Sequence, residues 1–413
     1  MVFLVALFAV SFLYAQKTEW RGQNGTGIYN DSLLMKDWPE EGPELLFTVD
    51  GIGDGWGGSV FDGVSYYVAG KKDTLDLLTR VDSNGDVVWQ KPFGPSWGKS
   101  FPHARTTPVI ENDRIYAISG SGTLVCFDKS SGDEIWKVDV DEKFDAKWHK
   151  WGVAETPLVY QDMIISVPGG DNTTMVALNK LTGETIWKTE SLGHMRSYVS
   201  PVVCEVNNKD YLLGMTTHHL FAVDPENGGV KWKYAFAEKI AQLQDKKNSG
   251  YINANSPLSK GNRILVSQGY DGGSIMLEVS DDMNNVKEVW VERTLDNHHH
   301  GLVLYDGAVY GSNWHNNKQG EWVCMDWETS EILWLEDYNT KGITIFADDM
   351  LYLYDEKGNV SLVKPDKDEM EVVDTFRIHH GQGQHWAHPS IADGKLIIRH
   401  GNAFAVYNIR QQK

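Results

Sequence analysis

Three consecutive histidines precede an apolar run, in the stretch LDNHHHGLVL at residues 295–304. Imidazole binds transition metals when neutral and exchanges protons near neutral pH. On an extended segment His298 and His300 would share one side and His299 would face the other, so one metal could not take all three. A metal site would need ligands from elsewhere, and the candidate donors are His385, His388, Glu155 and Asn255. We predict no metal site, and expect two of the histidines to act as hydrogen-bonding or acid–base groups.

Other chemically capable side chains recur in short segments, each just before an apolar stretch: GDGWGGSVF, FPHARTTPV, WGVAETPLV, MRSYVSPVV, YINANSPLS, DNHHHGLVL, NTKGITIFA and QHWAHPSIA. Their polar residues differ from segment to segment. We predict catalytic groups at His299, His300, Tyr198, Glu155 and His388. We predict ligand-binding groups at Trp56, Arg105, Arg196, Asn253, Asn255, Lys341, His385 and Trp386. In these roles the cations would hold an anion, and the two tryptophans would stack on a sugar ring.

A repeat positions these segments. A turn, a β-branched residue and a tryptophan recur at NGDVVWQ, SGDEIWK, TGETIWK, NGGVKWK, NVKEVWV and TSEILWL. A short strand ending in Asp or Asn precedes most of these motifs, and before it come two more short strands joined by a hairpin turn such as N-D or D-G. Four antiparallel strands in a unit of about 40–50 residues predict an all-β fold, a β-propeller of four-stranded blades. The repeated tryptophan would fill the space between adjacent blades.

The count of units predicts eight blades in a single propeller over residues 43–410, after a lead-in at 16–42. The last unit, at 388–409, supplies only three strands. We expect PELLFTV, at 43–49, to complete it and to close the ring, because closure removes exposed sheet edges. In such a ring the segment entering each innermost strand lies at the mouth of the central channel. Unlike polar groups that converge there are typical of a ligand site, whereas a solvated lining or a protein-contact face remains the alternative.

The segment GTLVCFDKSSGDEIWKVDV resembles the repeat of pyrroloquinoline-quinone (PQQ) type propellers. This resemblance covers nearly all of the chain after the first residues. It implies the fold of quinoprotein alcohol dehydrogenases, which oxidise alcohols with bound PQQ and Ca²⁺. It equally fits the BamB-type propeller of the outer-membrane assembly machinery, which has no enzymatic role.

The family's dehydrogenases have a pair of adjacent cysteines beside the quinone. This chain has three cysteines, far apart in the sequence, which we expect to be buried core thiols: Cys126, Cys204 and Cys324. Glu155 and Asn255 could imitate the Ca²⁺ ligands, but no aspartate stands among the channel-mouth residues to act as the base. We therefore predict no cofactor, neither PQQ nor Ca²⁺.

The chain begins MVFLVALFAVSFLYAQ, an apolar run too short for a membrane span and typical of a signal peptide at residues 1–15. We expect export to the periplasm or the extracellular space, with no transmembrane segment after cleavage. The formal net charge of −19 argues against a nucleic-acid partner. We expect a monomer.

These observations predict an exported propeller that binds a small polar or carbohydrate-like ligand at the channel mouth, with lyase or hydrolase acid–base chemistry as a further use of the site. A non-enzymatic scaffold that binds other proteins is the alternative. A PQQ-dependent alcohol or sugar dehydrogenase is the second alternative.

Overall fold

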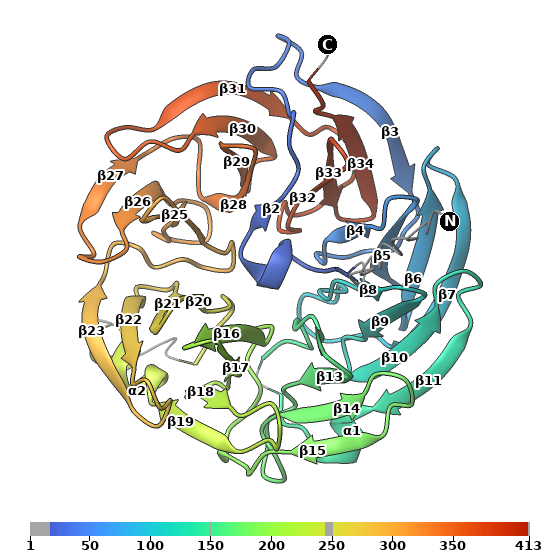
Figure 1. The fold of residues 1–413 in the computed structure, drawn as a ribbon. Helices are drawn as coiled ribbons and strands as arrows, with labels where there is room; N and C mark the ends of the chain where they lie inside the picture. The colour runs from blue at the N-terminus through green and yellow to red at the C-terminus, as the bar shows by residue number, and fades with distance from the viewer. Residues whose placement is uncertain (1–16, 149, 244–250, 412–413) are drawn as a thin grey trace, which may run out of the picture.

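Eight sheets, each built on four antiparallel strands, stand around one central axis in the computed structural model of this protein (Figure 1). The structure describes residues 17–148, 150–243 and 251–411, so the predicted signal peptide at 1–15 lies outside the described residues. Within the described part, no helix has the length and apolar character needed to cross a membrane. The predicted eight-bladed propeller of four-stranded blades is confirmed.

The first four blades follow one another along the chain, each with its innermost strand first. Their strands are β4 (Ser59–Phe61), β5 (Ser65–Lys72), β6 (Leu75–Asp82) and β7 (Val87–Pro95); β8 (Val109–Glu111), β9 (Arg114–Ile118), β10 (Thr123–Asp128) and β11 (Glu134–Asp139); β12 (Leu158–Tyr160), β13 (Met163–Ser166), β14 (Val176–Asn179) and β15 (Thr185–Lys188); and β16 (Val202–Val206), β17 (Lys209–Met215), β18 (Leu220–Val223) and β19 (Val230–Tyr234).

The next three blades repeat this order, and the eighth contributes three strands of its own. Their strands are β20 (Leu258–Lys260), β21 (Arg263–Gln268), β22 (Gly273–Val279) and β23 (Val286–Glu292); β24 (Val303–Tyr305), β25 (Ala308–Ser312), β26 (Trp322–Asp326) and β27 (Ile332–Glu336); β28 (Gly342–Ala347), β29 (Met350–Asp355), β30 (Asn359–Lys364) and β31 (Glu371–Arg377); and β32 (Ser390–Ala392), β33 (Lys395–His400) and β34 (Ala403–Asn408).

Strand β3 (Glu44–Asp50) closes the ring. It pairs antiparallel with β34, from Glu44 opposite Asn408 to Asp50 opposite Ala403, and is the outermost strand of the eighth blade. The prediction that a strand near 43–49 completes the last unit is therefore confirmed. With this pairing the first and last blades are joined through the N-terminal part of the chain, which leaves no open end of the ring.

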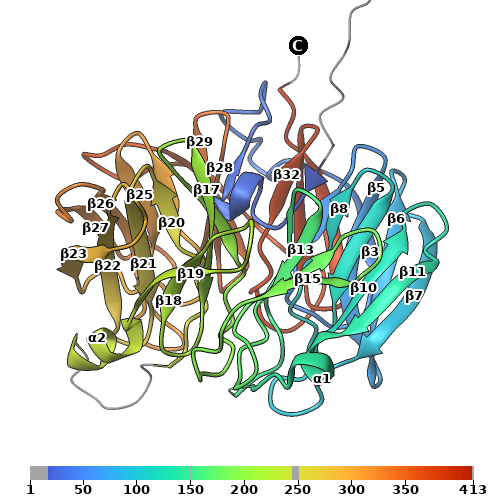
Figure 2. The same cartoon turned by 60° about the horizontal axis from the view of Figure 1, so that its bottom comes forward.

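The lead-in crosses one end of the channel (Figure 2). Its strand β1 (Lys17–Thr18) extends the second blade beside β8, and β2 (Ile28–Tyr29) extends the seventh beside β28. The 3-10 helix η1 (Gln23–Gly25) lies between them. Two short helices, α1 (Val140–Phe144) and α2 (Phe236–Leu243), follow outermost strands and lie at the opposite end of the ring.

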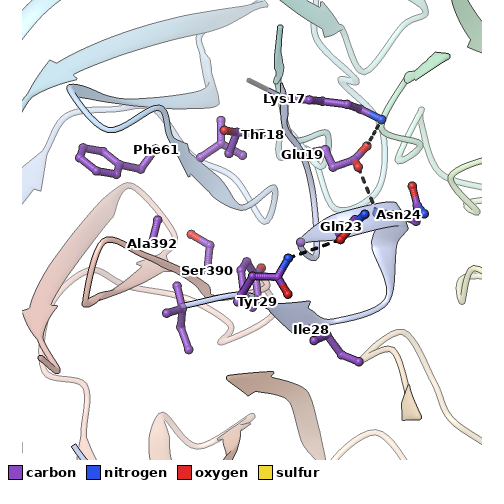
Figure 3. A pocket seen from close by; sticks show the side chains of 14 residues that line it. Lys17, Thr18, Glu19, Gln23, Asn24, Ile28, Tyr29, Phe61, Ser390 and Ala392 are labelled. Carbon is purple, nitrogen blue, oxygen red and sulfur yellow. Dashed lines mark hydrogen bonds and ion pairs between the residues drawn. The ribbon is translucent and has the colours of Figure 1, made fainter. Parts of the chain in front are cut away.

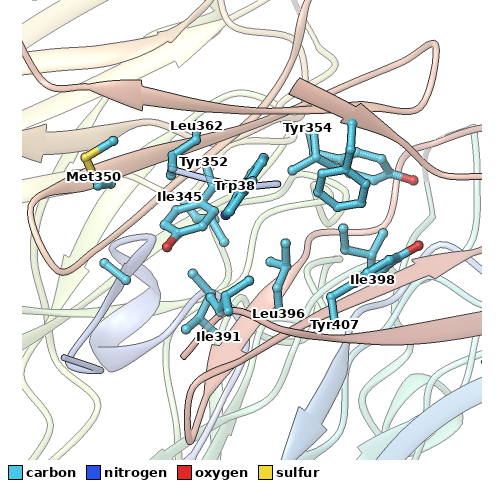
Figure 4. Packing of buried hydrophobic residues seen from close by; sticks show 14 of the residues in the cluster. Trp38, Ile345, Met350, Tyr352, Tyr354, Leu362, Ile391, Leu396, Ile398 and Tyr407 are labelled. Atoms are coloured by element: carbon cyan, nitrogen blue, oxygen red, sulfur yellow. The ribbon is translucent and has the colours of Figure 1, made fainter. Parts of the chain in front are cut away.

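Buried apolar side chains fill the spaces between adjacent blades. Figure 4 shows one such cluster, in which side chains of β28–β30 face those of β32–β34. Trp38 of the lead-in packs into the same cluster, edge-on to Phe376 with ring centroids 5.1 Å apart. The Trp38 backbone N–H donates to the Asp374 carboxylate at 2.7 Å. The lead-in is therefore part of the hydrophobic core.

The repeated tryptophan joins neighbouring blades. Trp187 of β15 donates its indole N–H to the carbonyl of Pro225 in the next blade, at 2.9 Å. Gly228 lies in that same turn with φ of +75°, and a Cβ there would lie 2.7 Å from the Trp187 ring. A glycine fits because it tolerates this backbone angle and has no side chain to meet the indole. The expected role between blades is confirmed for Trp187, and Trp136 and Trp334 make the equivalent hydrogen bond, to the carbonyls of Lys180 and Asp366.

Replacing Trp187 by phenylalanine is expected to lower the free energy of unfolding by about 1 kcal/mol. The ring can still fill the space, but the Pro225 carbonyl loses its buried donor. Urea denaturation followed by far-ultraviolet circular dichroism measures the change. The exposed neighbour Ile186 gives the control, since Ile186→Ala should change stability by less than about 0.5 kcal/mol. Equal losses in both variants would contradict this role of the indole.

Candidate functional site

A cavity of about 910 Å³ lies where the segments entering the innermost strands converge. Turns from the fifth to seventh blades complete its wall, and Trp20 of the lead-in also contributes. Six of the predicted site residues line it: Trp56, Arg105, Tyr198, His299, Trp386 and His388. The topology of the repeat thus brings together side chains that are up to 332 residues apart in the sequence. The individual roles assigned to them stay predictions.

Aromatic rings make up much of the wall. Those that line the cavity are Trp20, Trp56, Phe101, Trp151, Tyr198, Tyr270, Trp314 and Trp386. Several are in contact: the Trp56 and Trp386 ring centroids are 4.9 Å apart, and those of Trp151 and Tyr198 are 5.3 Å apart. The Tyr198 hydroxyl accepts the backbone N–H groups of Lys150 and Trp151, each at 2.9 Å. These contacts hold the rings as rigid, flat surfaces.

Two cations face this aromatic wall. The Arg105 guanidinium lies 5.1 Å from the Trp56 ring centroid, and the Lys150 ammonium lies 5.4 Å from that of Trp151. Burial lowers the pKa of Arg105 to about 10, which leaves the group charged at neutral pH. Within the described part of the chain, neither cation has a carboxylate within 4.0 Å. Arg105 and Lys150 therefore place positive charge on their part of the wall, while the carboxylates of Asp271 and Glu356 also line the cavity.

The three histidines do not lie as predicted. His298 and His299 both line the cavity, whereas His300 is fully buried behind them. The expectation that His298 and His300 share a side was wrong because the segment turns instead of extending. The Asn297 side-chain oxygen accepts the backbone N–H groups of His300 and Gly301, at 3.2 and 3.1 Å, and so stabilises that turn.

Glu356, in the turn between β29 and β30, is the acidic group of this cluster. Its Oε1 accepts hydrogen bonds from His300 Nε2 and Trp386 Nε1, both at 3.1 Å, and Lys341 Nζ donates to its Oε2 at 2.6 Å. Burial raises the pKa of Glu356, but its hydrogen bond to His300 and its electrostatic interactions with His300, His299 and Lys341 outweigh burial and lower the pKa to about 2. The carboxylate is thus ionised.

Sequence reasoning missed Glu356. The residues DEKGN at 355–359 are typical of a hairpin turn, and the channel-mouth residues were predicted only from the segments that enter innermost strands. Asp296 was missed as well. Its buried carboxylate accepts the backbone N–H groups of Asp271 and Trp314, at 3.0 and 2.8 Å, and so holds two loops of the cavity rim together.

The remaining predicted site residues lie behind the wall and hold it together. Arg196 is buried and paired with Asp141 at 2.8 Å, and Lys341 is buried against Glu356. Asn253 donates to the Thr216 carbonyl at 2.9 Å. Glu155 accepts hydrogen bonds from the Ser166 hydroxyl and the Val167 N–H. Asn255 donates to the Asn297 carbonyl at 2.6 Å. His385 forms a hydrogen bond with the Tyr354 hydroxyl at 2.6 Å.

These placements do not fit PQQ and Ca²⁺, the groups that the fold family implies. Glu155 and Asn255, the candidate Ca²⁺ ligands, bond within the wall and do not line the cavity. The three cysteines are free and buried in separate blades, as expected, so they form no adjacent pair beside the cavity. The residues present therefore do not support quinone chemistry at this site.

A second, smaller pocket of about 400 Å³ lies under the lead-in, at the other end of the channel (Figure 3). Its polar side chains bond to one another: Lys17 Nζ lies 2.6 Å from the Glu19 carboxylate, and Glu19 accepts the Asn24 backbone N–H at 3.1 Å. These contacts fasten the lead-in to itself and leave few polar groups free for a ligand.

Comparisons with known proteins agree with this architecture. The chain is 21% identical to the outer membrane protein assembly factor BamB of Yersinia pestis over 296 residues, which covers 71% of this chain and 72% of the relative. It is 22% identical to the protein of the same name from Shewanella oneidensis over 317 residues, covering 71% and 74%.

Solved structures show the same fold. The crystal structure of BamB from Moraxella catarrhalis superposes with a TM-score of 0.62 at 13% identity, covering 89% of this chain and 99% of the other. A quinohemoprotein alcohol dehydrogenase from Comamonas testosteroni gives a TM-score of 0.65 at 11% identity, covering 94% and 79%. The family model described as outer membrane protein assembly factor BamB matches residues 76–336, more than half of the chain. The chain therefore belongs to the BamB-like family of PQQ-repeat propellers.

Proposed function

We propose that this protein is an exported binding propeller, which holds a polar, carbohydrate-like ligand against the aromatic wall of the channel-mouth cavity. The observation that carries the proposal is the combination of flat rings with the two cations Arg105 and Lys150 in one concave site. Sugar rings present apolar C–H faces that stack on indoles, with hydroxyls at their edges. An acidic sugar would in addition place its carboxylate against the cations.

The proposed function is binding and not catalysis. Burial, together with the neighbouring charge of His300, lowers the pKa of His299 to about 3, so this ring is neutral at pH 7 and carries no proton to give as a general acid. The Tyr198 hydroxyl is held by two N–H donors, and burial raises its pKa. Lyase or hydrolase chemistry at these residues stays a prediction.

A protein-binding scaffold is the second candidate function. The family match over residues 76–336 favours it, since the matched relatives are named as assembly factors. The comparisons support this role more directly than they support a sugar ligand. The same name supports export, because outer membrane proteins are assembled outside the cytoplasm. The occupant of the cavity would then be an exposed segment of another protein.

Titration calorimetry of the purified protein distinguishes the two functions. We expect neutral and acidic oligosaccharides to bind, and Trp386→Ala and Arg105→Ala each to raise the dissociation constant at least about tenfold, equivalent to about 1.4 kcal/mol. Arg410→Ala, which removes a surface cation paired with Asp393, is the matched control and should bind as the parent does. Binding of extended peptides with alternating apolar residues, and of no sugar, would support the scaffold and overturn the first proposal.

A further inference from the structure

The cavity contains one cluster of side chains with the composition of a metal site. His298, His299 and Glu356 each offer a ligand atom, and these three atoms lie within 4.8 Å of one another. All three residues line the cavity. Two histidines come from the segment that enters the sixth blade, and the carboxylate comes from a turn of the seventh. The fold therefore supplies the third ligand that the histidine run itself lacks.

We propose that these three residues bind one divalent transition-metal ion, of the kind that imidazole ligands favour, at the wall of the cavity. Bonds of about 2.0–2.2 Å at tetrahedral angles place ligand atoms about 3.4 Å apart. His299 Nε2 already lies 3.8 Å from Glu356 Oε1. This separation is within about 0.4 Å of the spacing that a tetrahedral ion requires, and all three ligand atoms lie within 4.8 Å of one another.

The surroundings hold the carboxylate in place. Lys341 engages Oε2, while His300 and Trp386 donate to Oε1, the oxygen on the side of the imidazoles. Lys341 on Oε2 is an outer partner of the kind that orients a ligating carboxylate, and an ion bound at Oε1 would replace one of the two hydrogen bonds there. His298 adds a second sign, because its Nδ1 is buried without a hydrogen-bond partner. A buried imidazole nitrogen normally has a partner, and an ion bound at Nδ1 would supply one.

In the part of the chain that the structure describes, the other groups of contacting histidines do not have this geometry. His194 stacks on His218 with centroids 4.0 Å apart and planes 14° apart, and His385 stacks on His400 at 3.7 Å and 18°. The nitrogen lone pairs lie in the ring planes, so rings stacked face to face do not point at a common centre. In the proposed site, by contrast, the His298 and His299 planes are 52° apart.

Three protein ligands leave a coordination position that opens into the cavity, as in metal sites that bind a water or a ligand. The ion would attract oxygen donors such as vicinal hydroxyls or a carboxylate. The proposed metal site does not depend on the proposed function, because metal binding can be measured without any sugar.

The test uses the full-length exported chain without a purification tag, stripped with a chelator and then dialysed against Zn²⁺ or Co²⁺. We expect one equivalent of metal per chain by elemental analysis, and a visible absorption band from nitrogen-bound Co²⁺. His299→Gln and Glu356→Gln should each lose that equivalent and the band at the same free metal concentration. Mg²⁺ and Ca²⁺, which prefer oxygen ligands, should not compete at equal concentration.

His194→Gln is the matched control, since it removes a histidine from a stacked group outside the cavity and should retain the metal. The melting temperature of each stripped variant verifies that it is folded. The Co²⁺ spectrum of the parent protein is independent of any variant. The proposal is overturned if the parent binds no metal, or if His299→Gln and Glu356→Gln bind as much Zn²⁺ as His194→Gln does.

Discussion

Deletion of residues 1–50 is expected to abolish the cooperative unfolding of the propeller. Strand β3 supplies the outermost strand of the eighth blade and is hydrogen-bonded to β34 along its length. Its Phe47 ring also packs edge-on against Tyr66 of the first blade, with centroids 5.6 Å apart. Without β3 the eighth blade has an unpaired edge, and the first and last blades lose the segment that joins them. Each blade depends on its neighbours to bury its faces, so the loss affects the whole ring.

Urea denaturation followed by tryptophan fluorescence measures this effect: the parent should show one steep transition and the deletion variant a broad one or none. A permuted chain provides the control. Because Glu44 lies opposite Asn408 in the register, a short turn after residue 411 can lead directly into residues 43–50 at the new C-terminus. This variant should regain much of the cooperative transition. A deletion variant that unfolds as steeply as the parent would show that β3 does not close the ring.

The architecture was predictable because its signals are local and repeated. Each tryptophan motif marks an outermost strand, and the incomplete last unit requires a strand from elsewhere, which was placed at 43–49 and is found at Glu44–Asp50. The helices α1 and α2 were not predicted, because five and eight residues are too few to show helical periodicity. Structural features that repeat along the chain can therefore be predicted from the amino-acid sequence alone.

The candidate site was predictable only in its location. Topology alone brings the segments entering the innermost strands to one place, and the cavity is there. The side chains that face the cavity are selected by local turns and pairings. Asn297 stabilises a turn that directs His300 inward, and the ion pair with Asp141 buries Arg196 behind the wall. Glu356 reaches the cavity from a turn that has no distinguishing sequence. Tertiary contacts thus determine which side chains face the cavity, and such contacts leave no periodic pattern in the sequence.

The contacts of the lead-in could not be predicted from the sequence either, because its main contact is with backbone atoms. Arg21 is buried and donates to the carbonyls of His300, Leu302 and Thr344, at 3.1, 2.8 and 3.3 Å. Its guanidinium also lies 3.1 Å from His388 Nδ1. One side chain thereby connects the sixth, seventh and eighth blades at the centre of the ring. Carbonyl acceptors are present at every residue, so no sequence motif indicates this connection.

Replacing Arg21 by methionine is therefore expected to destabilise the protein by at least about 3 kcal/mol. Three buried carbonyls lose a charged donor, and each unsatisfied acceptor costs about 1–3 kcal/mol. Burial lowers the Arg21 pKa to about 10, so at pH 7 the native group is a cation and its hydrogen bonds are charge-assisted. Arg21→Lys keeps the charge but has one nitrogen in place of three, so it should recover only part of the loss.

Urea denaturation at pH 7 measures both Arg21 variants against Arg410→Met, whose arginine is exposed and pairs with Asp393. That control should stay within about 0.5 kcal/mol of the parent. Trp20 gives a second readout, because it lines the cavity next to Arg21 and its ring lies 5.1 Å from that of His388. Release of Arg21 should change the tryptophan fluorescence of the folded protein as well as its stability. If Arg21→Met were as stable as Arg410→Met, the blades would be held together at the axis without Arg21, and the lead-in would contribute through the edge pairing of β1 and β2 and the packing of Trp38.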